Sequence, residues 1–266
     1  MSCNIIINKD LHSKNQDKRI KFIIMHYTET TLEHAIDLLT NGEVSAHYLI
    51  PESTNEIYQL VAENNRAWHA GNSFWQNRTH INDTSIGIEI VNQGYSKNKD
   101  NKYSWQKFTE QQIINIIELA KDIIKRYQIP QTNILAHSDI APERKLDPGP
   151  LFPWEKLAHN GIGAWYNNDL KMELEQAFNQ KKIFADIKWL QKSLLLYGYN
   201  IKVTEQLDPQ TKKVISAFQM HFRSKDFSGF PDLETFAILA ALNKKYYPAQ
   251  AIQLITEEEQ YNKIST

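Results

Sequence analysis

Between about residues 20 and 155, apolar runs of strand length alternate with helical patterns, and this alternation limits the possible folds more than any other feature. Strands interleaved with helices indicate an α/β domain in which helices cover one sheet. The predicted strands are residues 19–27, 47–51, 56–62, 84–92 and 133–138.

Two helices are predicted between these strands. In residues 30–41, Thr30 and Glu33 have the spacing of a capping box, and an Asn-Gly pair follows as a stop signal. A longer helix is expected to begin at Thr109, where Gln112 completes a second capping box. Its apolar residues recur on one face until a proline ends the pattern.

The strand patterns stop after about residue 184, and three helical patterns follow. They describe a small helical module, in which the second helix has an Asp cap and Pro209 at its first position. The charged segment before them is expected to be a solvated connecting helix or linker. The three helical patterns lie in residues 186–200, 207–222 and 231–246.

The composition excludes several classes of protein. The 30 basic and 31 acidic residues nearly cancel, so no nucleic-acid partner is expected. No apolar run reaches the ~18 residues of a membrane span, and no secretory signal pattern is visible. Cys3 is the one cysteine, which excludes an internal disulfide and leaves histidines and carboxylates as metal ligands. Whether Cys3 is acylated or a free thiol stays open.

Two predicted strands end in a histidine, His26 and His137. His137 precedes the stiff stretch "AHSDIAPERKLDPGP", in which Asp147 is followed by Pro-Gly-Pro and could fold back to share a metal. Two imidazoles and one carboxylate are the usual protein ligands of a catalytic zinc ion. A histidine at a strand end is nevertheless more often a hydrogen-bonded surface or core residue.

Glu89 interrupts an otherwise apolar strand. In "TSIGIEIVN" the three isoleucines share one face, so Glu89 lies on the other face together with Gly87. A carboxylate there is either paired with a cation or kept for proton transfer, because burying it alone is costly. Gly87 indicates that another group approaches the backbone closely.

Five separated motifs carry a resemblance to a known family. In order, "FIIMHYTET", "SAHYLI", "AWHAGNSFW", "SIGIEIVN" and "AHSDIAPERKLDPGP" resemble the zinc-dependent N-acetylmuramoyl-L-alanine amidases of the type 2 class, and most closely the AmiD-type branch. The resemblance covers about residues 18 to 160. It implies a mixed β-sheet flanked by helices.

The resemblance also implies roles for single residues. The family's zinc ligands fall on His26, His137 and Asp147, with one Zn²⁺ per chain. Its catalytic carboxylate falls on Glu89, and its lysine that stabilises the transition state falls on Lys145. Each of these positions holds the expected residue type, so the resemblance implies an active enzyme.

Four further residues match motif positions and are expected to contact substrate: His47, Trp68, His69 and Asn92. For His47 and His69 a buried structural role is an open alternative, and Trp75 is either a sugar-stacking or a core residue. Four histidines lie outside the motifs and are expected at the surface: His12, His34, His159 and His221. Arg144 is expected to be a surface charge, close enough to Lys145 to touch an acidic stem peptide.

The second region resembles the three-helix peptidoglycan-binding domain of many wall hydrolases, through "WLQKSLLLYGYN", "LDPQTKKVISAFQ" and "PDLETFAIL". A helical bundle that merely packs on the first domain is the alternative. The predicted division is a zinc amidase domain over 1–170, a linker over 171–184, a three-helix domain over 185–245 and a tail over 246–266.

The resemblance implies hydrolysis of the amide bond between N-acetylmuramic acid, or its anhydro form, and L-alanine of the peptidoglycan stem peptide. In this mechanism zinc activates water, Glu89 transfers its proton, and Lys145 stabilises the developing oxyanion. A peptidoglycan-binding or sensing protein with little turnover and a zinc peptidase for another amide are the alternatives. The expected partners are peptidoglycan or muropeptides, the expected state is a monomer, and the cell envelope or periplasm is preferred over the cytoplasm.

Overall fold

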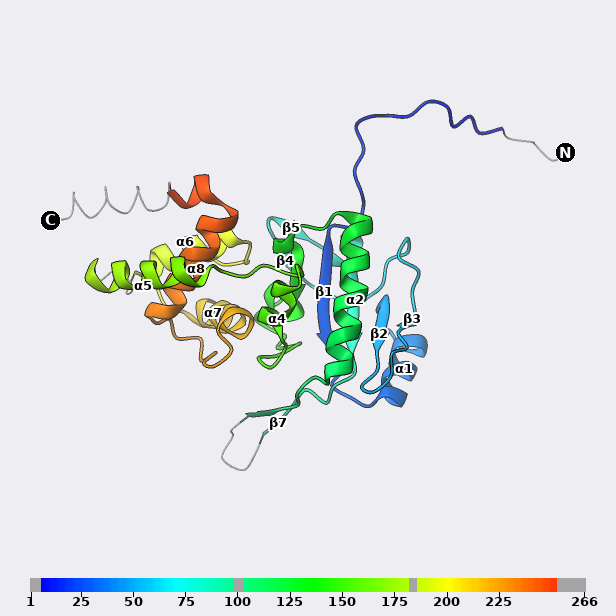
Figure 1. Cartoon of the computed structure of the whole chain (residues 1–266), viewed down its shortest axis with the longest axis horizontal. Coiled ribbons are helices and arrows are strands. Elements are labelled where there is room, and N and C mark those ends of the chain that lie inside the picture. Colours follow the sequence, from blue (N-terminus) through cyan, green and yellow to red (C-terminus); the bar gives the residue numbers. More distant parts are fainter. Residues whose placement is uncertain (1–5, 98–102, 182–185, 253–266) are drawn as a thin grey trace.

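The computed structural model describes residues 6–97, 103–181 and 186–252. Five strands form one sheet with the order β3-β2-β6-β1-β9, in which β3 is antiparallel and the other pairs are parallel (Figure 1). This mixed sheet confirms the expected fold class. Its strands are β1 (Phe22–Tyr27), β2 (Tyr48–Ile50), β3 (Tyr58–Gln59), β6 (Ser85–Ile90) and β9 (Ile134–Ala136).

One face of the sheet packs on the long helix α2 (Glu110–Tyr127). Because side chains alternate along a strand, Ile23 and Met25 of β1 face α2 together with the three isoleucines of β6. The cap of α2 is as predicted: the Thr109 hydroxyl accepts from the Gln112 N–H, and the Gln112 side chain accepts from the Thr109 N–H.

The opposite face of the sheet is covered in two parts. Helix α1 (Leu32–Asn41) packs near β2, where Ala35, Leu49 and Val91 are buried together. The predicted Thr30 capping box is wrong, because Thr31 is the N-cap and its side chain makes no capping hydrogen bond. The other part is covered by the C-terminal helices, which pack on Phe22, Ile24 and Leu135.

The C-terminal helices share one continuous core with the sheet. Helix α5 covers most of the predicted linker, which agrees with the expected connecting helix, but its buried Leu174 and Phe178 belong to this core, so the helix is not solvated on all sides. His221 is also buried, not exposed as predicted. These helices are α5 (Asn168–Lys181), α6 (Ile187–Tyr197), α7 (Pro209–Phe222) and α8 (Leu233–Tyr246).

Several short elements had no signal in the sequence, because two to six residues are too few to show a period. Four of them form two antiparallel pairs, β4 with β5 and β7 with β8. The predicted tail beyond residue 252 and Cys3 lie outside the described residues. The short elements are β4 (Phe74–Trp75), β5 (Arg78–Thr79), η1 (Ile81–Thr84), β7 (Tyr95–Lys97), β8 (Tyr103–Trp105), η2 (Gln131–Asn133), α3 (His137–Ile140) and α4 (Trp154–His159).

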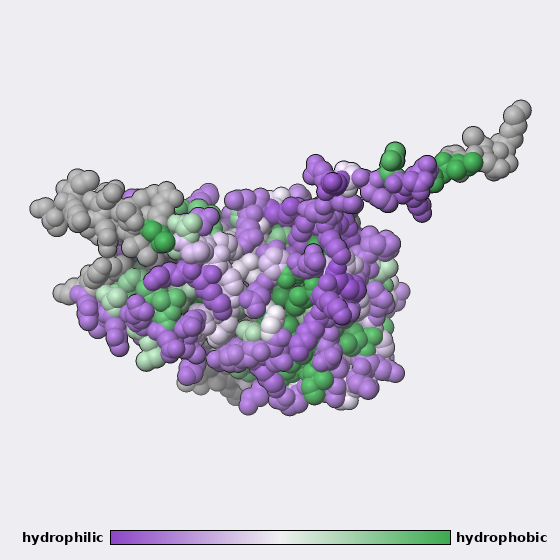
Figure 2. Space-filling view, turned by 45° about the horizontal axis from the view of Figure 1, so that its top comes forward, coloured by the Kyte–Doolittle hydropathy of each residue, from purple (hydrophilic) through white to green (hydrophobic). Residues whose placement is uncertain are grey.

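The surface in Figure 2 is mostly hydrophilic, with small separate hydrophobic areas. Within the ranges that the structure describes, no helix has both the length and the apolar composition that crossing a membrane requires.

Candidate metal centre and active site

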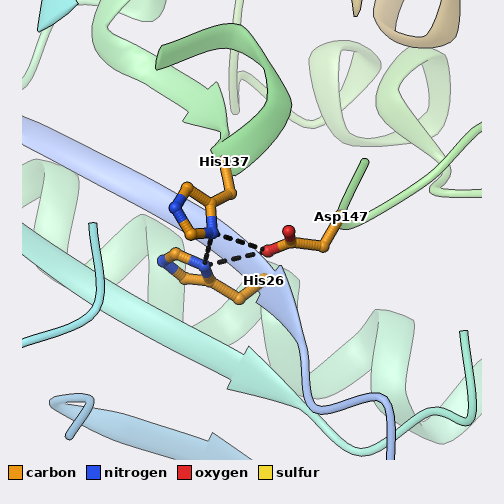
Figure 3. A group of neighbouring side chains, drawn as sticks. All are labelled: His26, His137 and Asp147. Atoms are coloured by element: carbon orange, nitrogen blue, oxygen red, sulfur yellow. Dashed lines mark hydrogen bonds and ion pairs between the residues drawn. The ribbon is translucent and has the colours of Figure 1, made fainter. Parts of the chain in front are cut away.

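Three buried side chains meet beside the carboxyl end of β1 (Figure 3). The Nδ1 atoms of His26 and His137 are 3.0 Å apart, and Oδ2 of Asp147 lies 3.1 Å from the first and 3.0 Å from the second. His26 is the fifth residue of β1, His137 is the first residue of α3, and Asp147 comes from the loop after α3. The structure therefore brings together the three residues predicted as metal ligands.

Neighbouring groups bind the outer nitrogen of each imidazole. Nε2 of His137 lies 3.2 Å from the backbone oxygen of Ala70, to which it donates. Nε2 of His26 lies 3.0 Å from Nδ1 of His69, and Nε2 of His69 lies 3.1 Å from the Ser85 hydroxyl. With the proton on each outer nitrogen, both Nδ1 lone pairs point to the space beside Asp147. Such partners orient the histidines of metal sites.

The protonation states suit metal binding. Burial and the neighbouring His137 lower the pKa of His26 to about 4, so its imidazole is neutral at neutral pH. Burial alone would raise the pKa of Asp147, but charge and hydrogen bonds from the two histidines hold it well below its usual range. A neutral imidazole and an ionised carboxylate are the forms that bind a metal.

The geometry of the three groups fits a small cation. A tetrahedral Zn²⁺ with ligands at about 2.0–2.1 Å separates its ligand atoms by about 3.3 Å. The three ligand atoms are 3.0 to 3.1 Å apart. Two imidazole lone pairs that face each other at this distance repel, and a cation between them removes the repulsion.

Glu89 lies next to His26 on the neighbouring strand, where the two residues are paired in register. Its Oε2 atom is buried, with no hydrogen-bond partner among the described residues. Burial, and then the negative charge of Asp147, raise the pKa of this carboxyl well above its usual range, while Lys145 acts in the opposite direction. An ionised carboxylate is costly to bury without a partner, which suits this group to exchanging a proton.

The close approach predicted at Gly87 is confirmed, and the approaching group is His69. A Cβ atom on Gly87 would lie 2.4 Å from Cγ of the His69 ring. Glycine therefore makes room on β6 for the imidazole that hydrogen-bonds His26.

A cavity of about 300 Å³ opens beside the metal-ligand group, where His137 and Asp147 line it, and reaches Leu39 of α1. Two predicted substrate contacts, Trp68 and His69, line it together with Glu89 and Lys145. Trp68 is 53% exposed and the Arg66 guanidinium lies 4.0 Å from its ring centre. Trp75, in contrast, is fully buried in the core that the sheet shares with the C-terminal helices.

The other two predicted substrate contacts do not line this cavity. His47 is fully buried; its Nδ1 accepts from the Gly87 N–H and its Nε2 lies 3.3 Å from the Asn65 oxygen. Asn92 is also buried, and its side chain bonds the backbone of Gly94 and Gln106. These positions fit the structural alternative for His47 and a turn-stabilising role for Asn92.

Arg144 is exposed, as expected, and its guanidinium also reaches the metal-ligand group. It donates to the backbone oxygens of Ala70 and Asn72, and one of its nitrogens lies 3.3 Å from Nε2 of His137. It thereby fixes the loop that follows His69. The sequence held no signal for this contact, because the partners are backbone atoms about 70 residues away.

The profile of the N-acetylmuramoyl-L-alanine amidase family matches residues 16–150, which contain all three candidate ligands. The chain belongs to this family. Residues 185–239 of the chain match a second family, that of a peptidoglycan binding domain. The N-acetylmuramoyl-L-alanine amidase AmiD of Escherichia coli K12 is 44% identical over 234 residues, which are 86% of this chain and 84% of that protein.

Solved structures of family members agree over nearly the whole chain. The crystal structure of AmpDh3 from Pseudomonas aeruginosa has a TM-score of 0.85 and 39% identity, and the match covers 92% of this chain and 99% of that one. The E. coli AmiD complex with anhydro-N-acetylmuramic acid-L-Ala-D-γ-Glu-L-Lys has a TM-score of 0.80 and 40% identity, covering 90% and 95%. The likeness thus includes the C-terminal helices.

Proposed function

We propose that this amidase hydrolyses the amide bond between N-acetylmuramic acid, or its anhydro form, and L-alanine of peptidoglycan stem peptides. The observation that carries the proposal is the buried group of His26, His137 and Asp147 with the carboxyl of Glu89 beside it. AmiD, a relative with 44% identity, is named for this activity and has been crystallised with a substrate of this kind.

We assign one Zn²⁺ ion to the three ligands. Two imidazole nitrogens and one carboxylate leave a fourth position open, which is the arrangement of a catalytic zinc site. When bound there, zinc supplies a Lewis acid that lowers the pKa of water towards ~7.

Glu89 is the proposed proton carrier. A carboxylate with a raised pKa is a stronger base, so ionised Glu89 can accept the proton of the attacking water and then donate it to the leaving nitrogen of L-alanine. Lys145 lines the same cavity, and its ammonium group is assigned to the negative charge that develops on the former carbonyl oxygen. His69 holds His26, and the half-exposed ring of Trp68 is assigned to the substrate.

The proposal extends to the place of action. Residues 185–239 match a peptidoglycan binding domain, and a module that binds polymer is useful where the wall is assembled. We therefore propose the cell envelope as the location, with peptidoglycan or muropeptides as partners and a monomer as the working state.

The test is mass spectrometry of purified muropeptides after incubation with the chain, with a chelator and with zinc added back. Release of stem peptides that begin with L-alanine, lost with chelator and restored by zinc, is the expected result. Glu89→Gln should lower turnover by about 10²- to 10⁴-fold and leave one zinc ion per chain. Intact muropeptides with zinc bound would instead favour a binding or sensing protein.

A further inference from the structure

One buried carboxylate connects the metal-ligand group with the C-terminal helices. Asp139 is 1% exposed and lies in α3, two residues after His137. Its Oδ1 accepts from the Tyr199 hydroxyl at 2.6 Å, and its Oδ2 accepts from His221 Nδ1 at 2.7 Å. Oδ2 also accepts from the Ala136 N–H at 2.8 Å, which caps the start of α3. Asp139 therefore bonds two side chains from the C-terminal helical part of the chain.

Helix α3 in turn fixes two of the three metal ligands. His137 is its first residue. The N–H of Ser138 donates to the backbone oxygen of Asp147 at 3.0 Å, so the helix also fixes the loop that carries the carboxylate ligand. A four-residue helix has little stability of its own, because it closes too few hydrogen bonds to offset its nucleation. Its position must come from the contacts that its side chains make.

The partners of Asp139 are held firmly. The His221 ring is stacked on Trp154 with ring centres 3.8 Å apart, and it comes from α7. The Tyr199 ring contacts Trp75 edge-on at 4.9 Å and is fully buried. Both rings lie in a packed interior where few rotamers are open, so they present fixed hydrogen-bond donors to Asp139.

We propose that Asp139, Tyr199 and His221 are positioning residues, through which the C-terminal helices hold α3 and hence the metal ligands in place. This inference rests on the metal site of the proposed function. It gives the C-terminal helices a second task besides binding wall polymer: they complete the support of the active site. Removing one donor leaves Asp139 buried and under-satisfied, and α3 can then shift.

The experiment measures metal binding in the full chain with Tyr199→Phe, His221→Leu and His221→Asn. Zinc affinity is taken from competition with a chromophoric chelator, and the visible spectrum of the Co²⁺ form reports ligand geometry. We expect about tenfold weaker zinc binding and a changed cobalt spectrum in Tyr199→Phe and His221→Leu, the size seen for outer partners of metal ligands. His221→Asn can still donate from the Nδ1 position and should recover part of the affinity.

Tyr197→Phe is the matched control. Tyr197 is a buried tyrosine in the same aromatic cluster, and its ring packs on Trp75 and Phe222. Asp139 accepts its side-chain hydrogen bonds from Tyr199 and His221 and not from Tyr197. It should lower the melting temperature without changing zinc affinity. If all variants keep the wild-type affinity and spectrum while only melting changes, the residues are structural and the inference fails. If the wild-type chain binds no zinc, the proposed function fails instead.

Discussion

At the scale of single residues, the site depends on the space that a missing side chain leaves as well as on contacts. Gly87 carries no chemistry, yet it decides whether His69 can lie against β6 and reach His26. The sequence allowed this close approach to be predicted, because a glycine in an apolar strand has few other reasons to be there. It could not identify His69 as the approaching group, since the two residues meet only through the fold.

Gly87→Ala should therefore loosen the metal centre. The added methyl group would overlap the His69 ring, and overpacking of this kind costs about 1–3 kcal/mol. Urea denaturation should show this loss, and zinc affinity should fall because His69 no longer orients His26. In a His69→Ala background the ring is gone, so the same substitution should cost much less. An equal cost in both backgrounds would contradict the assignment.

At the scale of elements, the sequence predicted what depends on local patterns. The five strands of the sheet lie within the predicted ranges, although each is shorter than predicted, and α2 with its cap agrees with the prediction, since periodicity and capping are local properties. The strand predicted over 56–62 shrinks to Tyr58–Gln59, and α3 and both short strand pairs were missed. The positions of these short elements are set by tertiary contacts such as those of Asp139. Its partners lie far away in the sequence, so a local pattern cannot predict them.

The two N-caps provide a test at this scale. Thr109→Ala should lower the free energy of unfolding by about 1 kcal/mol, because the Thr109 hydroxyl accepts from the Gln112 N–H and also donates to the Glu52 oxygen. Thr31→Ala is the control, since the Thr31 side chain makes no capping hydrogen bond with α1. Chemical denaturation of both variants gives the comparison. A larger loss in Thr31→Ala would mean that α1 is capped differently in solution.

A second test concerns how α2 is joined to the sheet. Glu63 accepts from Arg126, Tyr127 and Tyr48. Burial opposes the change, but these hydrogen bonds and the charge of Arg126 lower the pKa of Glu63 to about 2. A carboxyl with a lowered folded-state pKa adds stability above its unfolded value of about 4.5, and this part is lost as the pH falls through about 2.

Unfolding free energies measured between pH 6 and 2 should therefore fall less in Glu63→Gln than in the wild type. The variant should already be less stable at pH 6, by an amount on the order of 2 kcal/mol, because a buried partner of Arg126 is replaced. Asp17, which pairs with Lys21 at the exposed surface, supplies the control variant Asp17→Asn with little expected change. Parallel pH curves for wild type and Glu63→Gln would refute this role.

At the scale of the whole molecule, the sequence indicated two regions but did not indicate that they pack into one core. The composition changes after residue 184, and nothing in the sequence shows that Ile24 of the sheet and Phe236 of α8 belong to one continuous core. The same limit applies to the site. Residue types and motif order predicted the candidate ligands, but not the contact of Arg144 with His137 inside the first region. The hydrogen bond between His221 and Asp139 likewise forms only when the two regions pack.

A shared core has a direct thermodynamic consequence. When apolar residues of two regions are buried against each other, neither can unfold without exposing the other, so unfolding becomes a single cooperative transition. We expect one calorimetric transition for the full chain. Ile24→Ala in the sheet and Phe236→Ala in α8 should each lower the free energy of unfolding by about 2–5 kcal/mol and shift that one transition to lower temperature, because both side chains are fully buried. Leu195→Ala, which truncates a 43% exposed side chain, is the control. Two separated transitions, each shifted by only one substitution, would mean that the C-terminal helices are an independent module and that their contacts with α3 contribute little to holding the metal ligands.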